Sequence, residues 1–222
     1  MDKYKLSDIT KEWEGHTLYR IRAVRDFGFV RAGTLGGWVE SEINLSQKGN
    51  CWIYNDAIVC DKARVKDDAY VFQSGIVKDE ARVEDWSQVW GHAVVGDIAV
   101  LRGNSQINNN VRLYDSAIMT DDASAWGNTE IGGVVKIGGE SEIVGDGFIT
   151  SRQDIFWTSQ LGADGYALTA FRCKDGRIYV FAHFTSGYIE EFEQYVNRKM
   201  AKSPDKKLYK STIEFIKVYF RL

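Results

Sequence analysis

NDAIVC DKARVK DDAYVF QSGIVK DEARVE, residues 55–84, is the stretch that decides the fold of this 222-residue chain. In nearly every group of six, a turn former stands first, a small residue third and a branched aliphatic residue fifth, and the phase runs on to residue 144. The first position is Gly, Asn or Asp in fourteen of the fifteen units from residue 55 to residue 144. A strict short period is the signature of a repeat architecture, in which each unit is stabilised by stacking on its neighbours.

Positions three and five of each unit point to the same side of the chain, as alternate residues of a strand do. The interior is therefore expected to receive one small and one bulky side chain from every unit. Gly, Asn and Asp at position one tolerate the left-handed backbone of a tight corner. Three units then make a triangular coil of eighteen residues, and successive coils hydrogen-bond edge to edge at a spacing of about 4.8 Å.

The hexads resemble those of the left-handed parallel β-helix hexapeptide-repeat superfamily over residues 49–144. The resemblance implies an all-β solenoid, a left-handed parallel β-helix of about five coils; its handedness is a property of that family. A right-handed solenoid of the bactofilin type is the competing fold. The segment that begins at Leu18 and contains AGTLGGWVESEINLSQKGNCWIY is similar to the start of uncharacterised bacterial and prophage hexapeptide-repeat proteins, a non-enzymatic branch. This narrower resemblance implies a phage or prophage origin.

The limits of the period divide the chain into three segments. Residues 1–48 are expected to form an N-terminal cap, residues 49–150 the hexapeptide-repeat β-helix, and residues 151–222 a small α+β unit. A cap is needed because the end of a solenoid exposes unpaired backbone and apolar core. Within the cap, residues 17–27 alternate apolar and charged side chains and predict a strand.

The C-terminal segment predicts a ββαα unit that either caps the last coil or packs on the side of the solenoid. Residues 166–173 and 177–185 read as two strands of a hairpin that turns at Asp175-Gly176. Two amphipathic helices follow. Their expected core faces are Tyr188, Ile189, Phe192, Tyr195, Val196 and Met200 for the first helix, and Leu208, Thr212, Phe215, Ile216, Tyr219 and Leu222 for the second.

The net charge of −3 is distributed unevenly. Residues 55–150 hold sixteen acidic and eight basic residues, and residues 151–222 hold eight and twelve; corner positions account for many of the acids. We expect no membrane partner and no export, because there is no apolar run of about eighteen residues and no apolar stretch typical of a secretory signal. The three cysteines, Cys51, Cys60 and Cys173, show no metal-ligand spacing. We therefore expect no metal, no cofactor and a reduced cytoplasm, that of a bacterial host.

One histidine, His92, lies in the repeat, at position two of its unit and so outward near a corner. Many left-handed β-helix proteins are acyltransferases that use a histidine as general base between subunits, and the resemblance would give that role to His92. A general base needs an orienting partner and a substrate within hydrogen-bond reach. Asp85 and Asp97 flank His92 in the sequence, but nothing fixes their geometry, and no loop interrupts the hexads to form a substrate cleft. We predict no catalytic residue, with His92 as the alternative.

Outward-facing aromatic residues recur along one edge of the predicted solenoid. An apolar edge on the outside of a solenoid usually marks an interface. We expect the C-terminal helices or another subunit to cover it, since homotrimers are common in the family. The alternative is a pocket for a ligand or partner, lined by Phe72, Trp86, Trp90, His92 and Trp126, with possible anion contacts from Arg20 and Arg22.

The leading hypothesis is a non-enzymatic β-helix binding or scaffold protein that is a homo-oligomer, expected as a trimer, and that binds a host protein or a small molecule. The phage-like resemblance implies a counter-defence inhibitor or a nucleotide sequesterer, in which aromatic rings and basic side chains of the cap or the tail hold the nucleotide. One alternative is a hexapeptide-repeat acyltransferase with His92 as its base. Another is an acidic mimic of duplex DNA that inhibits a DNA-binding protein. Direct nucleic-acid binding along the acidic repeat is disfavoured by its charge.

Overall fold

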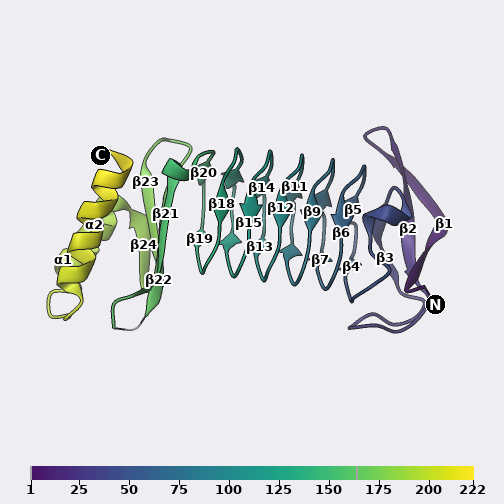
Figure 1. The fold of residues 1–222 in the computed structure, drawn as a ribbon, viewed down its shortest axis with the longest axis horizontal. Helices are drawn as coiled ribbons and strands as arrows, with labels where there is room; N and C mark the ends of the chain where they lie inside the picture. The colour runs from purple at the N-terminus through teal and green to yellow at the C-terminus, as the bar shows by residue number, and fades with distance from the viewer. Residues whose placement is uncertain (1, 164) are drawn as a thin grey trace.

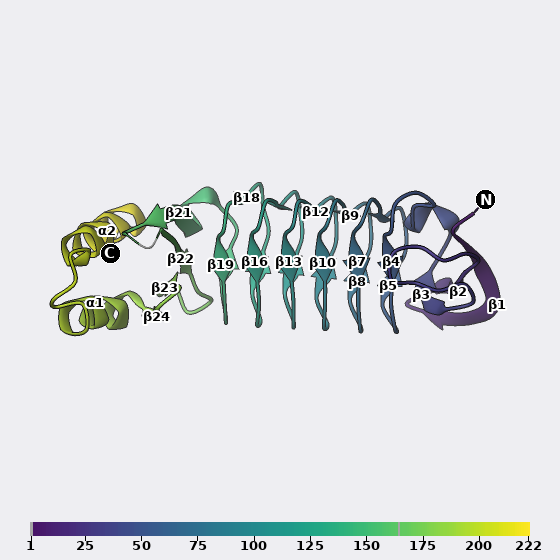
Figure 2. The ribbon, with the colours of Figure 1, turned by 90° about the horizontal axis from the view of Figure 1, so that it is seen from below.

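The computed structural model describes residues 2–163 and 165–222. The chain forms a straight rod, with strands of an N-terminal cap at one end, a stack of coils in the middle, and four strands with two helices at the other end (Figure 1 and Figure 2). The predicted all-β solenoid with a small α+β C-terminal unit is confirmed. The stack is about six coils deep, because the six-stranded sheet takes one strand from each coil.

Three parallel sheets form the sides of the solenoid. The first side contains β3 (Leu35–Val39), β5 (Ile58–Val59), β8 (Ile76–Val77), β11 (Val94–Val95), β14 (Arg112–Leu113), β17 (Glu130–Ile131) and β20 (Phe148–Ile149). The second side contains β4 (Trp52–Ile53), β7 (Tyr70–Val71), β10 (Gln88–Val89), β13 (Gln106–Ile107), β16 (Ser124–Ala125) and β19 (Glu142–Ile143). The third side contains β6 (Arg64–Val65), β9 (Arg82–Val83), β12 (Val100–Leu101), β15 (Ile118–Met119) and β18 (Lys136–Ile137).

Strand pairing confirms the eighteen-residue coil. Val94 pairs with Ile76 on one neighbouring coil and with Arg112 on the other, eighteen residues away in each direction. The interior receives positions three and five, as expected: Ala93 and Val95 have no exposed surface. Each coil therefore contributes small and bulky side chains to one continuous core, and stability is a sum over neighbouring coils.

Each corner is formed by a position-one residue in the left-handed backbone region, with φ from 52° at Asp97 to 83° at Gly127. Aspartate at this position also joins neighbouring coils. The carboxylate of Asp79 accepts a hydrogen bond from the backbone N–H of Asp97 (2.9 Å), and that of Asp97 accepts one from Asp115 (2.9 Å). The acids at the corners therefore have the structural role that the repeat predicted.

The N-terminal cap extends the first side and covers the open end of the stack. β1 (Tyr4–Trp13) and β2 (His16–Ala23) form an antiparallel hairpin, β2 pairs with β3, and η1 (Glu42–Asn44) follows. The buried Lys3 ammonium donates a hydrogen bond to the Cys51 carbonyl (2.9 Å) at this end. The hairpin also covers part of the outer face, where Leu18, Trp38 and Ile58 form a buried cluster.

The C-terminal unit caps the other end of the stack. After η2 (Arg152–Asp154), an antiparallel sheet contains β21 (Ile155–Leu161), β22 (Tyr166–Arg172), β23 (Ile178–Ala182) and β24 (Thr185–Tyr188) in that order. The predicted turn at Asp175-Gly176 is confirmed between β22 and β23. One face of the sheet meets the last coil, where Thr169 Oγ1 accepts a hydrogen bond from the Glu142 backbone N–H (3.0 Å). The other face packs on α1 (Ile189–Arg198) and α2 (Lys206–Phe220).

The predicted core face of α1 is confirmed at its centre, because Ile189, Phe192 and Val196 are buried. The predicted face of α2 is wrong by about one position. Apolar residues occur on more than one face of α2, so the sequence offers two apolar stripes with helical spacing. Packing against the sheet determines which of the two stripes is buried. The buried residues are Tyr209, Ile213, Ile216 and Phe220, whereas Leu208, Phe215 and Leu222 are exposed. No helix in the described ranges is long and apolar enough to span a membrane.

Candidate functional site

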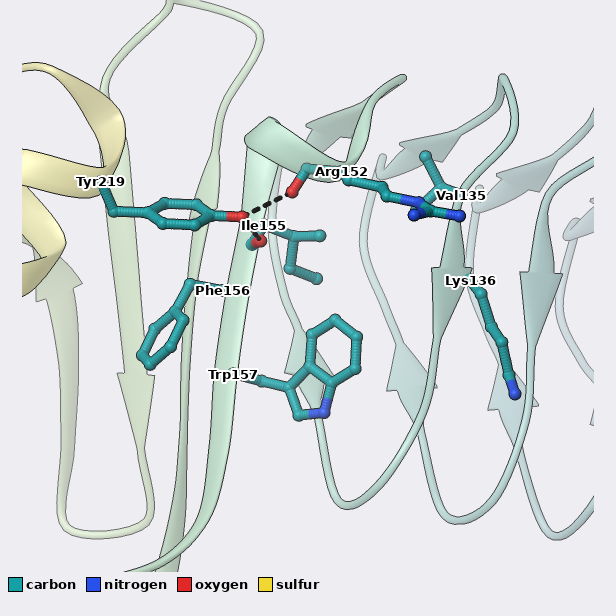
Figure 3. A pocket seen from close by; sticks show the side chains of 7 residues that line it. All are labelled: Val135, Lys136, Arg152, Ile155, Phe156, Trp157 and Tyr219. Atoms are coloured by element: carbon teal, nitrogen blue, oxygen red, sulfur yellow. Dashed lines mark hydrogen bonds between the residues drawn. The ribbon is translucent and has the colours of Figure 1, made fainter.

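A cavity of about 390 Å³ lies where the last coil meets the C-terminal unit (Figure 3). This volume falls within the range of roughly 300–1,000 Å³ that is usual for small-molecule sites. Its walls combine the end of the third side, η2, the edge strand β21 and the last turn of α2. The lining residues are Val135, Lys136, Arg152, Ile155, Phe156, Trp157 and Tyr219.

Three aromatic residues line the C-terminal side of this junction cavity. Phe156 and Trp157 are neighbours on β21, and the ring of Tyr219 packs on that of Phe156 with centroids 5.8 Å apart. The Tyr219 hydroxyl shares its one proton between the carbonyls of Arg152 (2.7 Å) and Ile155 (3.0 Å), which fixes α2 against the start of β21. Burial raises the pKa of Tyr219, so its hydroxyl remains a protonated donor at neutral pH.

Two cations lie on the other side of the opening, Lys136 from β18 and Arg152 from η2 (Figure 3). Within residues 2–163 and 165–222, neither side chain has a hydrogen-bond or ion-pair partner. The neighbouring Arg172, by contrast, pairs with Asp154 at 3.3 Å. The junction cavity therefore combines surfaces on which a planar group can stack with two positive charges available for an anion.

The structure brings together only part of the aromatic set predicted from the sequence. Phe72 and Trp90 stack on successive coils with ring centroids 5.1 Å apart, and Tyr54 extends the column, nearly parallel to Phe72 at 4.9 Å. Trp126 stands two coils beyond Trp90, with Asn108 between them in the column, and is 43% exposed. The C-terminal helices lie beyond the end of the stack and do not cover this column (Figure 1). We call Tyr54, Phe72 and Trp90 the aromatic ladder.

Trp86 and His92 lie on opposite corners of the second side. Trp86 is 61% exposed and borders an open acidic hollow with Asp68 and Asp85. His92 is exposed just after Trp90, and its imidazole has no hydrogen-bond or ion-pair partner in the described part of the chain. None of the five main hollows among the described residues is lined by all five of the predicted side chains, or by His92.

The two predicted anion contacts of the cap already have hydrogen-bond partners within the chain. Arg20 donates hydrogen bonds to the carbonyls of Gly36 (2.9 Å) and Asn55 (3.2 Å), and its guanidinium lies over the Trp38 ring at 5.0 Å. Arg22 donates more weakly to the carbonyl of Gly33 (3.5 Å). Arg20 thus ties the cap to the first coil.

None of the three cysteines is prepared as a nucleophile. All three are buried, and burial is the largest cause of the raised pKa of each thiol. The pKa of Cys51 is raised, that of Cys60 is raised to about 12, and that of Cys173 is raised to about 11. Each thiol therefore keeps its proton at neutral pH, whereas nucleophilic attack requires the thiolate.

The comparison with known proteins gives a partial relative. No protein-family profile matches the chain. Over 63 residues the chain is 41% identical to the uncharacterized acetyltransferase YdcK of Escherichia coli (strain K12), and the match covers 25% of this chain and 19% of YdcK. The chain thus spans about a fifth of the length of that relative. The β-solenoid and this partial similarity together are consistent with a hexapeptide-repeat protein.

Proposed function

We propose that this chain is a non-catalytic β-solenoid protein that binds a small anionic molecule with a planar ring, of the nucleotide class, in the junction cavity. The observation that carries the proposal is that Phe156, Trp157 and Tyr219 share one cavity with two cations that have no partner in the described chain. Base stacking on an aromatic side chain contributes about 1–3 kcal/mol. A hydrogen bond to a charged group contributes about 1.5–3 kcal/mol.

The composition of the cavity wall favours binding over catalysis. The lining residues include no carboxylate, histidine or thiol. The Tyr219 hydroxyl in the lining keeps its proton at neutral pH, because its pKa is raised and its proton is shared with two carbonyl acceptors. General acid–base catalysis is most efficient with a group whose pKa lies near the working pH.

The proposal is tested by isothermal titration calorimetry with AMP, a cyclic dinucleotide and benzoate, and with adenosine as the uncharged comparison. We expect an anionic member to bind once per chain and adenosine to bind more weakly. Arg152→Gln removes one charge-assisted contact, so Kd should rise roughly 10–150-fold, and Lys136→Gln should act in the same direction. Arg112→Gln is the matched control, because Arg112 is exposed on the first side, away from the cavity. Equal affinity for wild type and Arg152→Gln would refute the proposal, as would no binding of any anion.

We also propose that three copies of the chain assemble side by side through the aromatic ladder. The ladder is a half-buried apolar surface on the outside of the stack that neither the cap nor the C-terminal helices cover. Sedimentation equilibrium should then give three times the chain mass of 25.2 kDa. Trp90→Ser, at the exposed end of the ladder, should shift the equilibrium toward monomer, whereas Trp126→Ser should change it less. A monomer at all concentrations would exclude the trimer.

Acyl transfer is the second candidate, and the observation that favours it is the partial identity with YdcK, whose name describes an acetyltransferase. In that case His92 would act as base in a cleft that only the assembled oligomer completes. Turnover of acetyl-CoA by wild type that is abolished in His92→Ala would establish this function. The phage origin and the mimicry of duplex DNA stay predictions; the latter requires a complex with a basic protein that dissociates on adding salt.

A further inference from the structure

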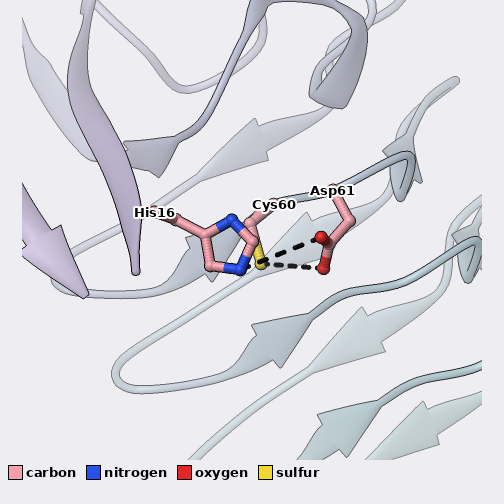
Figure 4. Close-up of side chains that lie close together, drawn as sticks. All are labelled: His16, Cys60 and Asp61. Atoms are coloured by element: carbon pink, nitrogen blue, oxygen red, sulfur yellow. Dashed lines mark hydrogen bonds and ion pairs between the residues drawn. The ribbon is translucent and has the colours of Figure 1, made fainter. Parts of the chain in front are cut away.

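A histidine, a thiol and a carboxylate meet where the cap hairpin touches the first coil (Figure 4), and a second carboxylate lies beside the imidazole. His16 is the first residue of β2, and Cys60 and Asp61 follow β5 at a corner of the solenoid. One ligand atom from each of these three residues lies within 4.8 Å of the others. Glu40, directly after β3, lies on the far side of the imidazole.

The two ring nitrogens of His16 face two different carboxylates. Its Nδ1 lies 3.3 Å from Glu40 Oε1, and its Nε2 lies 3.8 Å from Asp61 Oδ1. When Nδ1–H donates to Glu40, the lone pair of Nε2 faces the carboxylate of Asp61, so two acceptors point at each other. Histidines that bind metals almost always donate their other N–H to a carboxylate, carbonyl or water in this way.

The remaining atoms of the two carboxylates are held in place by the backbone. Asp61 Oδ2 accepts hydrogen bonds from the Asp79 N–H (3.1 Å) and from the Cys60 thiol (3.5 Å), so Oδ1 is the oxygen left for a ligand. Glu40 Oε2 accepts one from the Asp61 N–H (2.6 Å). The cluster is therefore positioned by the cap and by a corner that the hexad already fixes.

Burial and charge favour a cation at this place. Cys60 has no exposed surface, while the side chains of His16, Glu40 and Asp61 are 27%, 35% and 33% exposed. An ion can thus reach the cluster from solvent on the side of His16, Glu40 and Asp61, while the Cys60 thiol is shielded from solvent. Two carboxylates stand beside the thiol, and a divalent cation would offset their charge and displace the thiol proton.

We propose that His16 Nε2, Cys60 Sγ and Asp61 Oδ1 form a site for a borderline-soft divalent metal ion of the Zn²⁺ class, with Glu40 orienting the imidazole. Metal bonds of about 2.0–2.3 Å place tetrahedral ligands about 3.3–3.8 Å apart, so the ligand atoms, which lie within 4.8 Å of one another, would have to approach each other by about 1–1.5 Å at most. Three protein ligands leave the fourth position for water. The ion would link the cap to the first coil, independently of the junction cavity.

Cobalt titration tests the proposal, because Co²⁺ substitutes for Zn²⁺ and reports its ligands by absorption. We expect a near-ultraviolet thiolate-to-cobalt charge-transfer band with the visible bands of a tetrahedral ion, both abolished by added Zn²⁺. Cys60→Ser should remove the charge-transfer band. Cys173→Ser should retain it, since Cys173 is a buried thiol at the other end of the rod.

Substitutions of His16 and Glu40 distinguish a residue that binds the metal from a residue that only orients the imidazole. His16→Gln should abolish tight binding, while Glu40→Gln should weaken it by roughly 10–100-fold, as loss of an outer partner does. His92→Gln is the matched control at an exposed histidine. His16 is partly exposed, so His16→Gln serves if circular dichroism shows that Cys60→Ser does not fold. Absence of the charge-transfer band in wild type, or its survival in His16→Gln, would overturn the site and leave a protonated imidazole bridging two carboxylates.

Discussion

Replacing Gly127 or Gly145 by Ala separates the cost of a left-handed corner from the cost of stacking one coil on the next. Both glycines occupy position one of the same corner column, with φ of 83° and 73°. A Cβ on Gly127 would lie 2.5 Å from the carbonyl oxygen of Gly145, whereas a Cβ on Gly145 would meet no atom within 4 Å. The two substitutions therefore share the backbone strain and differ in the overlap.

The expected magnitudes follow from that difference. The left-handed conformation costs a residue with a Cβ roughly 1–2 kcal/mol, so Gly145→Ala should lower the free energy of unfolding by about that amount. Overlap with a neighbouring coil adds about 1–3 kcal/mol, so Gly127→Ala should lose about 2–5 kcal/mol in total. Equilibrium unfolding in urea, followed by far-ultraviolet circular dichroism, measures both. Equal losses would refute the reasoning, because they would mean that coils do not stack closely at this corner.

Two further predictions concern the C-terminal unit. Burial alone would raise the pKa of Asp154, but hydrogen bonds from Ser151, the preceding backbone and Arg172 lower it on balance. A lowered folded pKa adds stability above the unfolded value of about 3.9, and this stability is lost as pH falls through the folded value. Asp154→Asn should therefore lower the free energy of unfolding by about 1–3 kcal/mol at pH 7, and by less at pH 3. Urea unfolding of both proteins at the two pH values measures this difference. A difference that is the same at both pH values would contradict the prediction. Thr169→Val removes the acceptor of the Glu142 N–H and should cost about 1–3 kcal/mol, with faster hydrogen exchange at that amide; unchanged exchange would show that the sheet does not cap the last coil.

The hexads predict the coil because each position has one physical requirement that recurs in every unit. Where the spacing departs from six residues, these positional requirements no longer show in the sequence. Leu45 pairs with Val65, twenty residues on, while Ile53 pairs with Val71, eighteen residues on. The corner between Leu45 and Ile53 thus holds two extra residues, and the coil before residue 49 has no hexad signature.

The repeat pattern could not predict the two candidate sites, because their residues come from segments outside the repeat as well as within it. Lys136 and Tyr219 come from the last coil and the last helix, and only the docking of the C-terminal unit makes them neighbours. His16 and Cys60 likewise meet through the cap, so no ligand spacing in the sequence marks them. The aromatic ladder could be predicted, since Phe72 and its neighbours recur with the coil. Contacts between non-repeating segments depend on how those segments pack together, and they produce no recurring pattern in the sequence.

Fluorine NMR of the protein labelled with fluorotryptophan tests the proposed binding site most directly, because the competing surfaces each carry a tryptophan. The chain has seven tryptophans, and Trp157 is the one that lines the junction cavity. Single Trp→Phe substitutions assign the resonances. With the tightest-binding anion of the calorimetric panel added to saturation, we expect the Trp157 resonance to shift and those of Trp86, Trp90 and Trp126 to stay in place. A shift at any of these three with Trp157 unchanged would contradict the account and move the site to the outside of the solenoid.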